Sequence, residues 1–276
     1  MSEALRLMAV LAHPDDESLG NGGTLAKYSA EGAHVSLVTA TRGQSGRYLN
    51  FRSGPDHPGP EKLAIIREAE LRCAAETLGV KDVHVLDYVD GKLDQADPRK
   101  ILADIVTHLR RARPQVVLTF PPDGAYGHPD HIAISQFTTA AVVASADPGF
   151  VLEGPASGYA SHVVSKLYYM TVPRAEFEIY QRVFKRLIST VDGVEREAVP
   201  WQDWAITTVI DTRAHWQRVW KAVGCHQSQM ASYAGLAELT AETHEYLWGH
   251  QHYYRALSLV NGGRKLETDL FEGLRD

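Results

Sequence analysis

Two short polar segments contain the side chains that could perform chemistry. The first is Ala12-His13-Pro14-Asp15-Asp16-Glu17, and the second is Tyr126-Gly127-His128-Pro129-Asp130-His131. Imidazole and carboxylate groups at this density are costly to bury unless they are paired with one another or bind a metal ion. The pattern therefore raises the hypothesis that the two segments meet around one metal.

Catalytic zinc usually takes three protein ligands from His, Asp and Glu and keeps one position open. His13, Asp16 and His131 can supply two imidazoles and one carboxylate. Pro14 stiffens the turn, so that positions 13 and 16 can converge while Asp15 points elsewhere and stays free for proton transfer. Zinc (Zn2+) is the expected metal, although Fe2+ or cobalt could use the same ligands.

The elements around these segments predict an α/β fold. Strands are expected at residues 5–12, 35–41, 83–86 and 116–120, and helices at 24–31, 61–78, 98–111 and 131–145. Such alternation predicts a Rossmann-like, mostly parallel sheet with helices on both faces. Ligands of these sheets bind at the carboxyl ends of the strands, and both polar segments follow a strand.

The C-terminal half has a less regular pattern. It predicts strands at 163–172, 205–210 and 248–260 and helices at 174–189 and 213–224. Gly20-Asn21-Gly22-Gly23 predicts a tight turn before the first helix. Without a convincing linker, residues 1–276 are expected to form one domain, with residues 1–147 as the core that holds the metal site. Residues 148–276 would be an elaborated C-terminal portion that shapes the substrate cleft.

Composition excludes several classes of partner. The net charge of -6 and the lack of a Lys/Arg block argue against nucleic-acid binding. No apolar run approaches the ~20 residues that span a bilayer, so no membrane association is expected. The two cysteines, Cys73 and Cys225, predict neither a disulfide scaffold nor a cysteine-rich zinc site, and they favour a cytoplasmic location. Assembly into a homo-oligomer is left open.

The two segments resemble those of the PIG-L/LmbE-like zinc-dependent de-N-acetylase family, which includes deacetylases and an amidase of mycothiol and bacillithiol metabolism. The resemblance covers residues 5 to about 145, and Lys221 with His226-Gln227-Ser228-Gln229 is similar to a looser C-terminal pattern of the family. It implies hydrolysis of an N-acetyl group from an N-acetylglucosamine-type sugar or conjugate, with metal-bound water as the nucleophile. The expected partner is thus a small-molecule sugar substrate.

The same resemblance implies residue roles. His13, Asp16 and His131 match metal ligands, and Asp15 matches the general base. His128 matches the residue that stabilises the oxyanion, and Asp130 the carboxylate that orients His128. Tyr126 matches a mobile tyrosine that assists substrate binding and the transition state, and Arg67 an arginine that holds sugar hydroxyls.

One position departs from the family pattern. Relatives often have Glu in the turn after the second strand, where Arg42-Gly43-Gln44-Ser45-Gly46 has Gln44. Gln44 keeps hydrogen bonding but loses the charge. Arg42, Arg47 and Arg52 in the same loop could form a basic rim for an anionic substrate group, or could be solvated.

Other functions are weighed against deacetylation. A mycothiol-conjugate-type amidase would use the same site, and a metal-containing sugar-binding protein would not need Asp15. The Gly-rich turn does not make the dinucleotide-binding G-x-G-x-x-G pattern, and a two-metal phosphoesterase would need a second ligand set. A metal-dependent N-deacetylase, an enzyme acting on a linear amide, is the preferred interpretation.

Overall fold

A seven-stranded sheet runs through the part of the chain described by the computed structural model, residues 4–184, 188–191 and 193–275. Its strands are β1 (Arg6–Leu11), β2 (His34–Thr41), β3 (Asp82–Tyr88), β4 (Val116–Thr119), β5 (Lys166–Thr171), β8 (Thr208–Asp211) and β9 (His250–Ser258). Their spatial order is β3-β2-β1-β4-β5-β9-β8. The first five are parallel and β9 is antiparallel to both its neighbours, so the predicted Rossmann-like sheet is confirmed.

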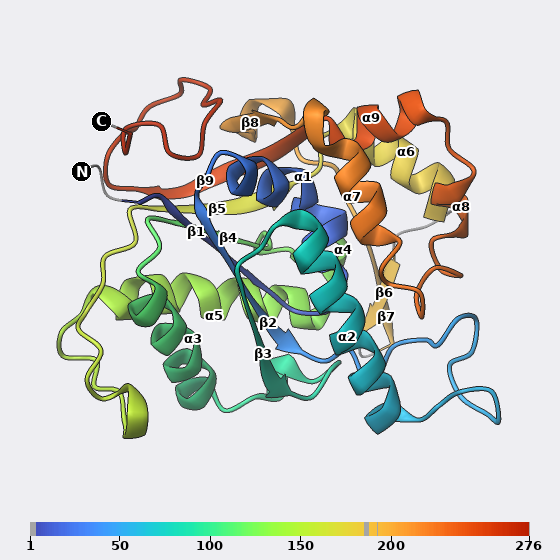
Figure 1. Cartoon of the computed structure of the whole chain (residues 1–276), viewed down its shortest axis with the longest axis horizontal. Coiled ribbons are helices and arrows are strands. Elements are labelled where there is room, and N and C mark those ends of the chain that lie inside the picture. Colours follow the sequence, from blue (N-terminus) through green and yellow to red (C-terminus); the bar gives the residue numbers. More distant parts are fainter. Residues whose placement is uncertain (1–3, 185–187, 192, 276) are drawn as a thin grey trace.

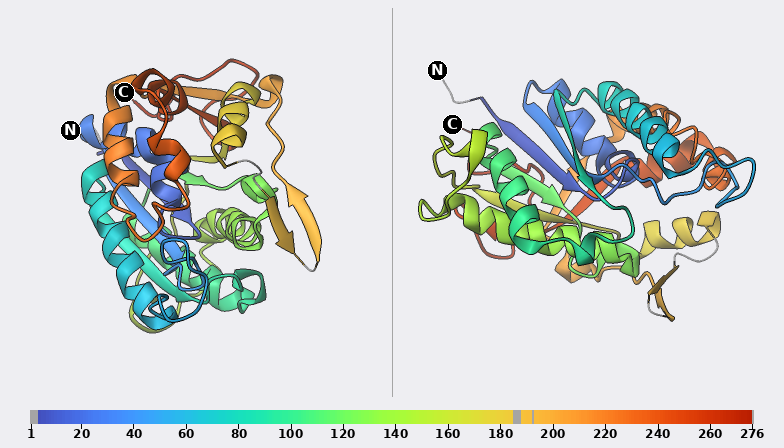
Figure 2. Two further views of the ribbon diagram at one scale, coloured as in Figure 1. Left: turned by 90° about the vertical axis from the view of Figure 1, so that its right-hand side faces the viewer. Right: turned by 90° about the horizontal axis from the view of Figure 1, so that it is seen from below.

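Helices cover both faces of the sheet, as Figures 1 and 2 show. One face has α1 (Asp16–Ala30), α2 (Pro60–Leu78) and α7 (Trp216–Val223), and the other has α3 (Pro98–Ala112) and α5 (Pro129–Ala146). The remaining short helices are α4 (Gly124–Gly127), α6 (Arg174–Phe184), α8 (Ala234–Ala237) and α9 (Ala241–Trp248), with 3-10 turns at Leu93–Gln95, Gly154–Ala156, Asp203–Ala205 and Arg213–His215. None of the described helices is both long and apolar enough to cross a membrane.

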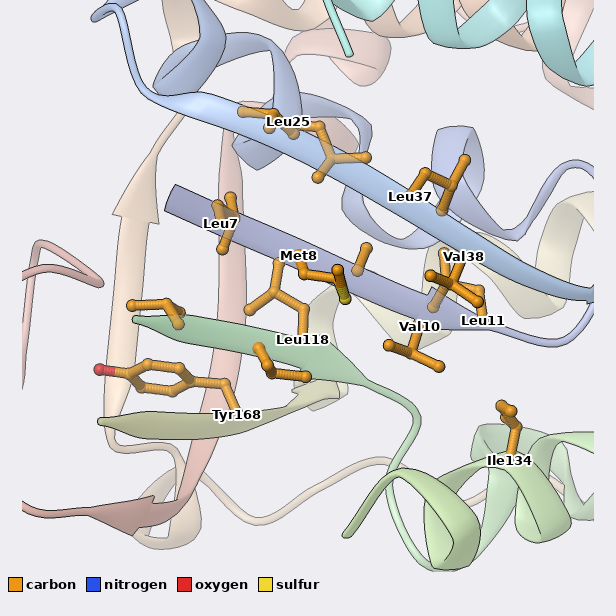
Figure 3. Close-up of a cluster of buried hydrophobic side chains, with 14 of the residues drawn as sticks. Leu7, Met8, Val10, Leu11, Leu25, Leu37, Val38, Leu118, Ile134 and Tyr168 are labelled. Carbon is orange, nitrogen blue, oxygen red and sulfur yellow. The ribbon is translucent and has the colours of Figure 1, made fainter. Parts of the chain in front are cut away.

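The core lies along the central strands. Residues Leu7 to Leu11 of β1 are fully buried, because helices cover the sheet on both sides. Figure 3 shows four of these side chains together with Leu37 of β2, Leu118 of β4 and Tyr168 of β5, and the four are Leu7, Met8, Val10 and Leu11. Rigid packing here fixes the end of β1, from which the first polar segment emerges.

The first helix corrects a prediction. It was expected to begin at Thr24 after a glycine turn, but α1 already includes Gly20-Asn21-Gly22-Gly23. The glycines allow close packing instead: a Cβ on Gly20 would lie 2.5 Å from the Met170 side chain, and one on Gly23 would lie 2.8 Å from Thr212. The glycines therefore bring α1 against the C-terminal portion.

The C-terminal portion also departs from expectation. The helix predicted over 174–189 ends at Phe184, residues 185–187 lie outside the described ranges, and a hairpin of β6 (Ile188–Val191) and β7 (Val194–Glu197) follows. In Figure 2 this hairpin projects from the body of the molecule. The β-branched residues of β6 favour a strand, a preference that the helical interpretation overlooked.

The two cysteines are paired, which corrects the expectation of no disulfide. Cys73 of α2 is bonded to Cys225, which follows α7, across 152 residues of sequence. Helices α2 and α7 pack side by side on one face of the sheet, which brings the two sulfur atoms together. Sequence spacing alone did not predict this pairing because it depends on that packing.

A buried carboxylate, Glu267, ties the C-terminal segment to the sheet. It accepts hydrogen bonds from Lys166 Nζ at 2.7 Å and Tyr168 Oη at 2.8 Å, and Arg255 Nη1 lies 3.0 Å away. Lys166 and Glu267 are both fully buried. Loss of Glu267 would therefore leave the buried Lys166 ammonium without its counter-charge.

Replacing Glu267 with Ala is expected to destabilise the fold by about 3–5 kcal/mol, because Lys166 stays buried and loses its main counter-charge. For a chain of this size the melting temperature should fall by roughly 10 °C. Glu272→Ala, which removes a partly exposed partner of Lys265, is the matched control and should leave the melting temperature unchanged. Equal shifts for the two variants would contradict the assignment.

The ionisation of Glu267 should also make the stability of the fold depend on pH. Burial acts to raise the pKa of Glu267, but hydrogen bonds from Lys166, Asn261 and Tyr168 outweigh it and lower the pKa to about 2 from an ordinary 4.5. A depressed pKa stabilises the fold above the ordinary value, and this contribution is lost as the pH falls through the folded value. The stability gap between wild type and Glu267→Ala should therefore narrow between about pH 4.5 and 2 in chemical denaturation.

Candidate active site

The two polar segments meet at one edge of the sheet. His13, Asp15 and Asp16 follow the carboxyl end of β1, and His128 and His131 follow β4, its neighbour. They line a cavity of about 710 Å³. Side chains of the C-terminal portion complete its wall, so that both halves of the chain contribute to one site.

Three donor side chains converge at the floor of this cavity. His13 Nδ1 lies 3.1 Å from His131 Nε2. Asp16 Oδ2 lies 3.6 Å from His13 Nδ1, and Asp16 Oδ1 lies 3.5 Å from His131 Nε2. Ligands of a tetrahedral zinc ion with bonds of about 2.0–2.1 Å stand about 3.3 Å apart. The predicted set of His13, Asp16 and His131 thus has the spacing and donor chemistry that fit a divalent metal.

The outer nitrogens of these imidazoles are held in place. His13 Nε2 lies 3.1 Å from both the Asp130 and the Asp90 carboxylates, and His131 Nδ1 lies 3.2 Å from the Gly124 carbonyl oxygen. Although burial opposes it, hydrogen bonds with Asp130, Asp16 and Asp90 raise the pKa of His13 well above its ordinary value. The three carboxylates around His13 thus favour a positive charge at this residue, and a bound metal cation would supply one.

Asp130 is placed differently from the expectation. Its carboxylate contacts His13 and accepts the backbone N–H groups of Gly91 and Leu93, whereas the resemblance had it orient His128. In the described part of the chain, the hydrogen bond between Asp130 and the His128 ring comes from the Asp130 backbone N–H, which donates to His128 Nδ1 at 3.2 Å, and not from the carboxylate. The carboxylate is therefore positioned to orient a metal ligand.

Asp130→Asn is consequently expected to weaken metal binding by about 10–100-fold, the usual effect of removing a group that orients a ligand. Competitive titration with a chromogenic chelator would measure this affinity. Asp94→Asn, in the neighbouring 3-10 turn, is the control. An Asp130→Asn protein with unchanged metal affinity and reduced kcat would instead support the role through His128.

Asp15 sits in a strained turn beside the donors. Its φ of 100° is unusual for a residue other than glycine, and its backbone N–H donates to Glu17 at 2.9 Å. Its Oδ2 accepts hydrogen bonds from Arg67 Nη2 at 2.9 Å and Tyr233 Oη at 2.5 Å. Burial raises the pKa of Asp15, and Arg67 opposes this effect. Both of these donors bind Oδ2, and Oδ1 accepts no hydrogen bond within the described residues.

Sequence reasoning missed Tyr233 and Asp90. Tyr233 is buried, lines the cavity and is separated from Asp15 by 218 residues, so no local pattern could pair them. Asp90 did have a detectable signal, because it follows β3 at the same sheet edge as the two predicted segments.

Tyr233→Phe is expected to lower kcat by roughly tenfold, because Asp15 loses one charge-assisted hydrogen bond and with it a fixed orientation. KM and metal content should stay unchanged, since the hydroxyl holds Asp15 and not the metal. Tyr246→Phe, at a half-exposed position, is the control. A raised KM with unchanged kcat would show that Tyr233 binds substrate instead.

His128 and Tyr126 lie beside the predicted metal ligands His13 and His131. The ring nitrogens of His13, His128 and His131 lie within 4.8 Å of one another, and Tyr126 packs edge-on against His128 and His131. Burial and the neighbouring imidazoles of His13 and His131 lower the pKa of His128 to about 4. A neutral His128 whose Nδ1 accepts the Asp130 N–H has its proton on Nε2, which makes it a donor.

The three residues predicted to bind substrate differ in whether they line the cavity. Arg67 lines the cavity but is 4% exposed, and besides Asp15 it donates to the Gly43 and Pro14 carbonyl oxygens. Gln44 donates to the Tyr88 carbonyl oxygen, and Arg42 pairs with Glu68 and Asp87. Neither of the last two lines the cavity. From the same loop, Arg47 and Arg52 do so.

Residues of the C-terminal pattern His226-Gln227-Ser228-Gln229 form hydrogen bonds with residues around the site. His226 bonds to Glu17 at 2.7 Å, with both side chains fully buried, while Ser228 donates to Glu70 of α2 through its N–H and hydroxyl. Gln229 donates to the Arg47 carbonyl oxygen at 2.7 Å. Glu17 therefore links the strained turn at Asp15 to the C-terminal portion. Lys221 of the same pattern is exposed.

The described residues thus form a Rossmann-like fold in which a cluster of histidines and carboxylates, with the donor chemistry of a metal site, lines the cavity beside Asp15. Residues 8–142 match the family described as "PIG-L: GlcNAc-PI de-N-acetylase". The chain is 34% identical to a 1D-myo-inositol 2-acetamido-2-deoxy-alpha-D-glucopyranoside deacetylase of Geodermatophilus obscurus, covering 99% of each. It is 32% identical to a mycothiol S-conjugate amidase of Streptomyces coelicolor, covering 100% of this chain and 99% of the relative.

The fold has counterparts among solved structures. The conserved protein TT1542 from Thermus thermophilus has a TM-score of 0.65 and 25% identity, over 94% of this chain and 97% of that one. The chain belongs to the PIG-L family. It is an enzyme that acts on an amide bond, as its relatives are.

Proposed function

We propose that this enzyme removes the N-acetyl group from an N-acetylglucosamine conjugate by metal-dependent hydrolysis. The observation that carries the proposal is the convergence of His13, Asp16 and His131 at the cavity floor with the Asp15 carboxylate beside them. The relatives named as deacetylases of an inositol-linked acetamido sugar favour a two-ring conjugate as the substrate.

His13, Asp16 and His131 would hold the metal, with Asp130 and Asp90 orienting His13. When bound there, a divalent ion supplies a Lewis acid that polarises the amide carbonyl and lowers the pKa of water. Zinc is the preferred ion, and Fe2+ offers the same coordination chemistry to these donors.

Asp15 would serve first as base and then as acid. Its Oδ1 takes a proton from the water that attacks the carbonyl carbon, and later returns it to the departing nitrogen as the C–N bond breaks. The products are acetate and the free amine. Arg67 and Tyr233 hold the other oxygen, so that the carboxylate cannot rotate away from the reacting atoms.

His128 would stabilise the oxyanion. Its Nε2–H can donate to the carbonyl oxygen as negative charge develops, a contribution that typically changes kcat by about 10²–10³-fold. Tyr126 beside it would close over the acetyl group, and Arg47 and Arg52 on the long loop would meet polar groups of the substrate.

The remaining expectations stay predictions. Residues 1–276 would act as one domain, since β5, β8 and β9 of the C-terminal portion complete the sheet of the core. A cytoplasmic location is likewise a prediction from the sequence, which left assembly into a homo-oligomer open.

A substrate panel tests the proposal. Zinc-loaded protein is incubated with N-acetylglucosamine, N-acetylglucosaminyl inositol and an S-conjugate of mycothiol, and acetate and free amines are measured. Acetate release that is fastest from the inositol conjugate supports it. Cleavage of the S-conjugate alone would assign the enzyme as an amidase, and sugar binding with no cleavage would make it a binding protein.

A further inference from the structure

The cavity extends well beyond the metal donors. Its far wall comes from α6, the end of α9, β9 and the segment around Trp201, and is mainly apolar and aromatic, with Phe177, Tyr180, Trp201 and Trp248. Glu176 and His252 stand among these side chains and also line the cavity. Sites for small molecules commonly combine such walls with a few polar groups that fix the orientation of the ligand.

Glu176 has unused hydrogen-bonding capacity. It is 8% exposed, and its Oε1 lies 3.2 Å from His252 Nδ1. That nitrogen has no hydrogen-bond partner in the described part of the chain, because the contact lacks the alignment of a hydrogen bond. Within the same residues, no other partner of the Glu176 carboxylate is found. Burial raises the pKa of Glu176, and the neighbouring His252 opposes this effect without cancelling it.

A buried carboxylate with so little compensation is costly unless a ligand supplies donors. Hydroxyl groups of a polyol ring are suitable donors, and the aromatic wall offers flat surfaces for the C–H faces of such a ring. An apolar acyl chain would fill the same space but would leave the carboxylate without donors. The pair therefore favours a hydroxylated ring.

The spacing of the strands gives the approximate distance between the Glu176–His252 pair and the proposed metal ligands. His131 follows β4, while His252 of β9 pairs with Thr171 at the carboxyl end of β5. From β4 to β9 there are two strand spacings, or about 10 Å in total. A ring attached to the N-acetylglucosamine can reach that far, whereas the sugar that carries the amide cannot occupy both positions.

We propose that Glu176 and His252 form a second subsite, which binds hydroxyl groups of the ring joined to the N-acetylglucosamine. This inference rests on the proposed function, because it takes the amide to lie at His13, Asp16 and His131. Glu176 accepts hydrogen bonds from the ring hydroxyls, and Trp201 and Phe177 contact its C–H faces. The subsite thereby selects two-ring conjugates over single sugars.

Calorimetric titration tests the subsite without relying on turnover. The ligands are glucosaminyl inositol, which has two rings and no amide to cleave, and methyl glucosaminide, which has one. Wild type should bind the two-ring ligand roughly 10–100-fold more tightly, the usual range for hydrogen bonds to a charged group. Glu176→Ala should remove most of that preference and leave the affinity for the single ring unchanged.

Glu178→Ala is the matched control, since Glu178 is exposed on the same helix. Kinetics on N-acetylglucosaminyl inositol give a second readout, in which Glu176→Ala should raise KM at least tenfold with little change in kcat. A wild type without two-ring preference, or a variant that loses affinity for both ligands alike, would overturn the subsite. Tight two-ring binding without acetate release would uphold the subsite and refute the deacetylase function.

Discussion

Replacing Asp15 with Asn lowers kcat by about 10²–10⁴-fold in the proposed mechanism, the range that general acid–base groups contribute. The amide side chain keeps the shape of the carboxylate but can neither accept nor return a proton. Metal content should stay near that of wild type, because His13, Asp16 and His131 form the donor set. Acetate release and metal analysis on the same preparation measure both effects.

Asp56→Asn, an exposed position on the long loop, is the control for this substitution. The strained backbone at Asp15 makes a check on folding necessary, and Asn tolerates a positive φ better than most residues. Its melting temperature should therefore remain close to that of wild type. Near-normal turnover by a folded Asp15→Asn protein would refute the role of Asp15 as base.

Removing His131 should abolish both metal binding and activity. His131→Ala removes one of the three predicted metal ligands. We therefore expect the metal affinity to fall by more than the ~10–100-fold that follows the loss of a group orienting a ligand. Zinc should then no longer raise the melting temperature, whereas for wild type we expect a rise that grows with the logarithm of the zinc concentration above Kd. Thermal shift at a series of zinc concentrations measures the difference.

His34→Ala tests whether any histidine would give the same result. His34 is exposed and forms an ion pair with Asp82. It is the first residue of β2 and so lies at the opposite end of that strand from the cavity. This variant should bind zinc as wild type does. If His131→Ala still bound one zinc ion tightly, the second group of donors, formed by His13, Asp90 and Asp130, would be the metal site instead.

The sequence predicts the catalytic half of the site because that half is local. His13, Asp15 and Asp16 lie within four residues, and the strand before them has the continuous apolar run of a buried parallel strand. Parallel topology then brings the end of β4 beside the end of β1. Pattern and topology together were sufficient to predict that His131 would approach His13, and the structure brings them within 3.1 Å.

The rest depends on tertiary packing that spacing does not encode. Tyr233 reaches Asp15 because the segment after α7 folds back over α2, and the same packing joins Cys73 to Cys225. The glycines of α1 were interpreted as a turn because local propensity disfavours them in helices, whereas contact with Met170 and Thr212 overrides that propensity. Asp130 likewise contacts His13, because backbone amides of Gly91 and Leu93, in the segment after β3, hold its carboxylate there.

The most direct test of the central claim is a zinc titration of the metal-free enzyme, with acetate release from N-acetylglucosaminyl inositol as the readout. We predict no release before zinc is added and a linear rise that ends at one equivalent per chain, with His131→Ala inactive throughout. Acetate release by the metal-free protein, or a rise that ends only at two equivalents, would contradict a single catalytic metal held by His13, Asp16 and His131.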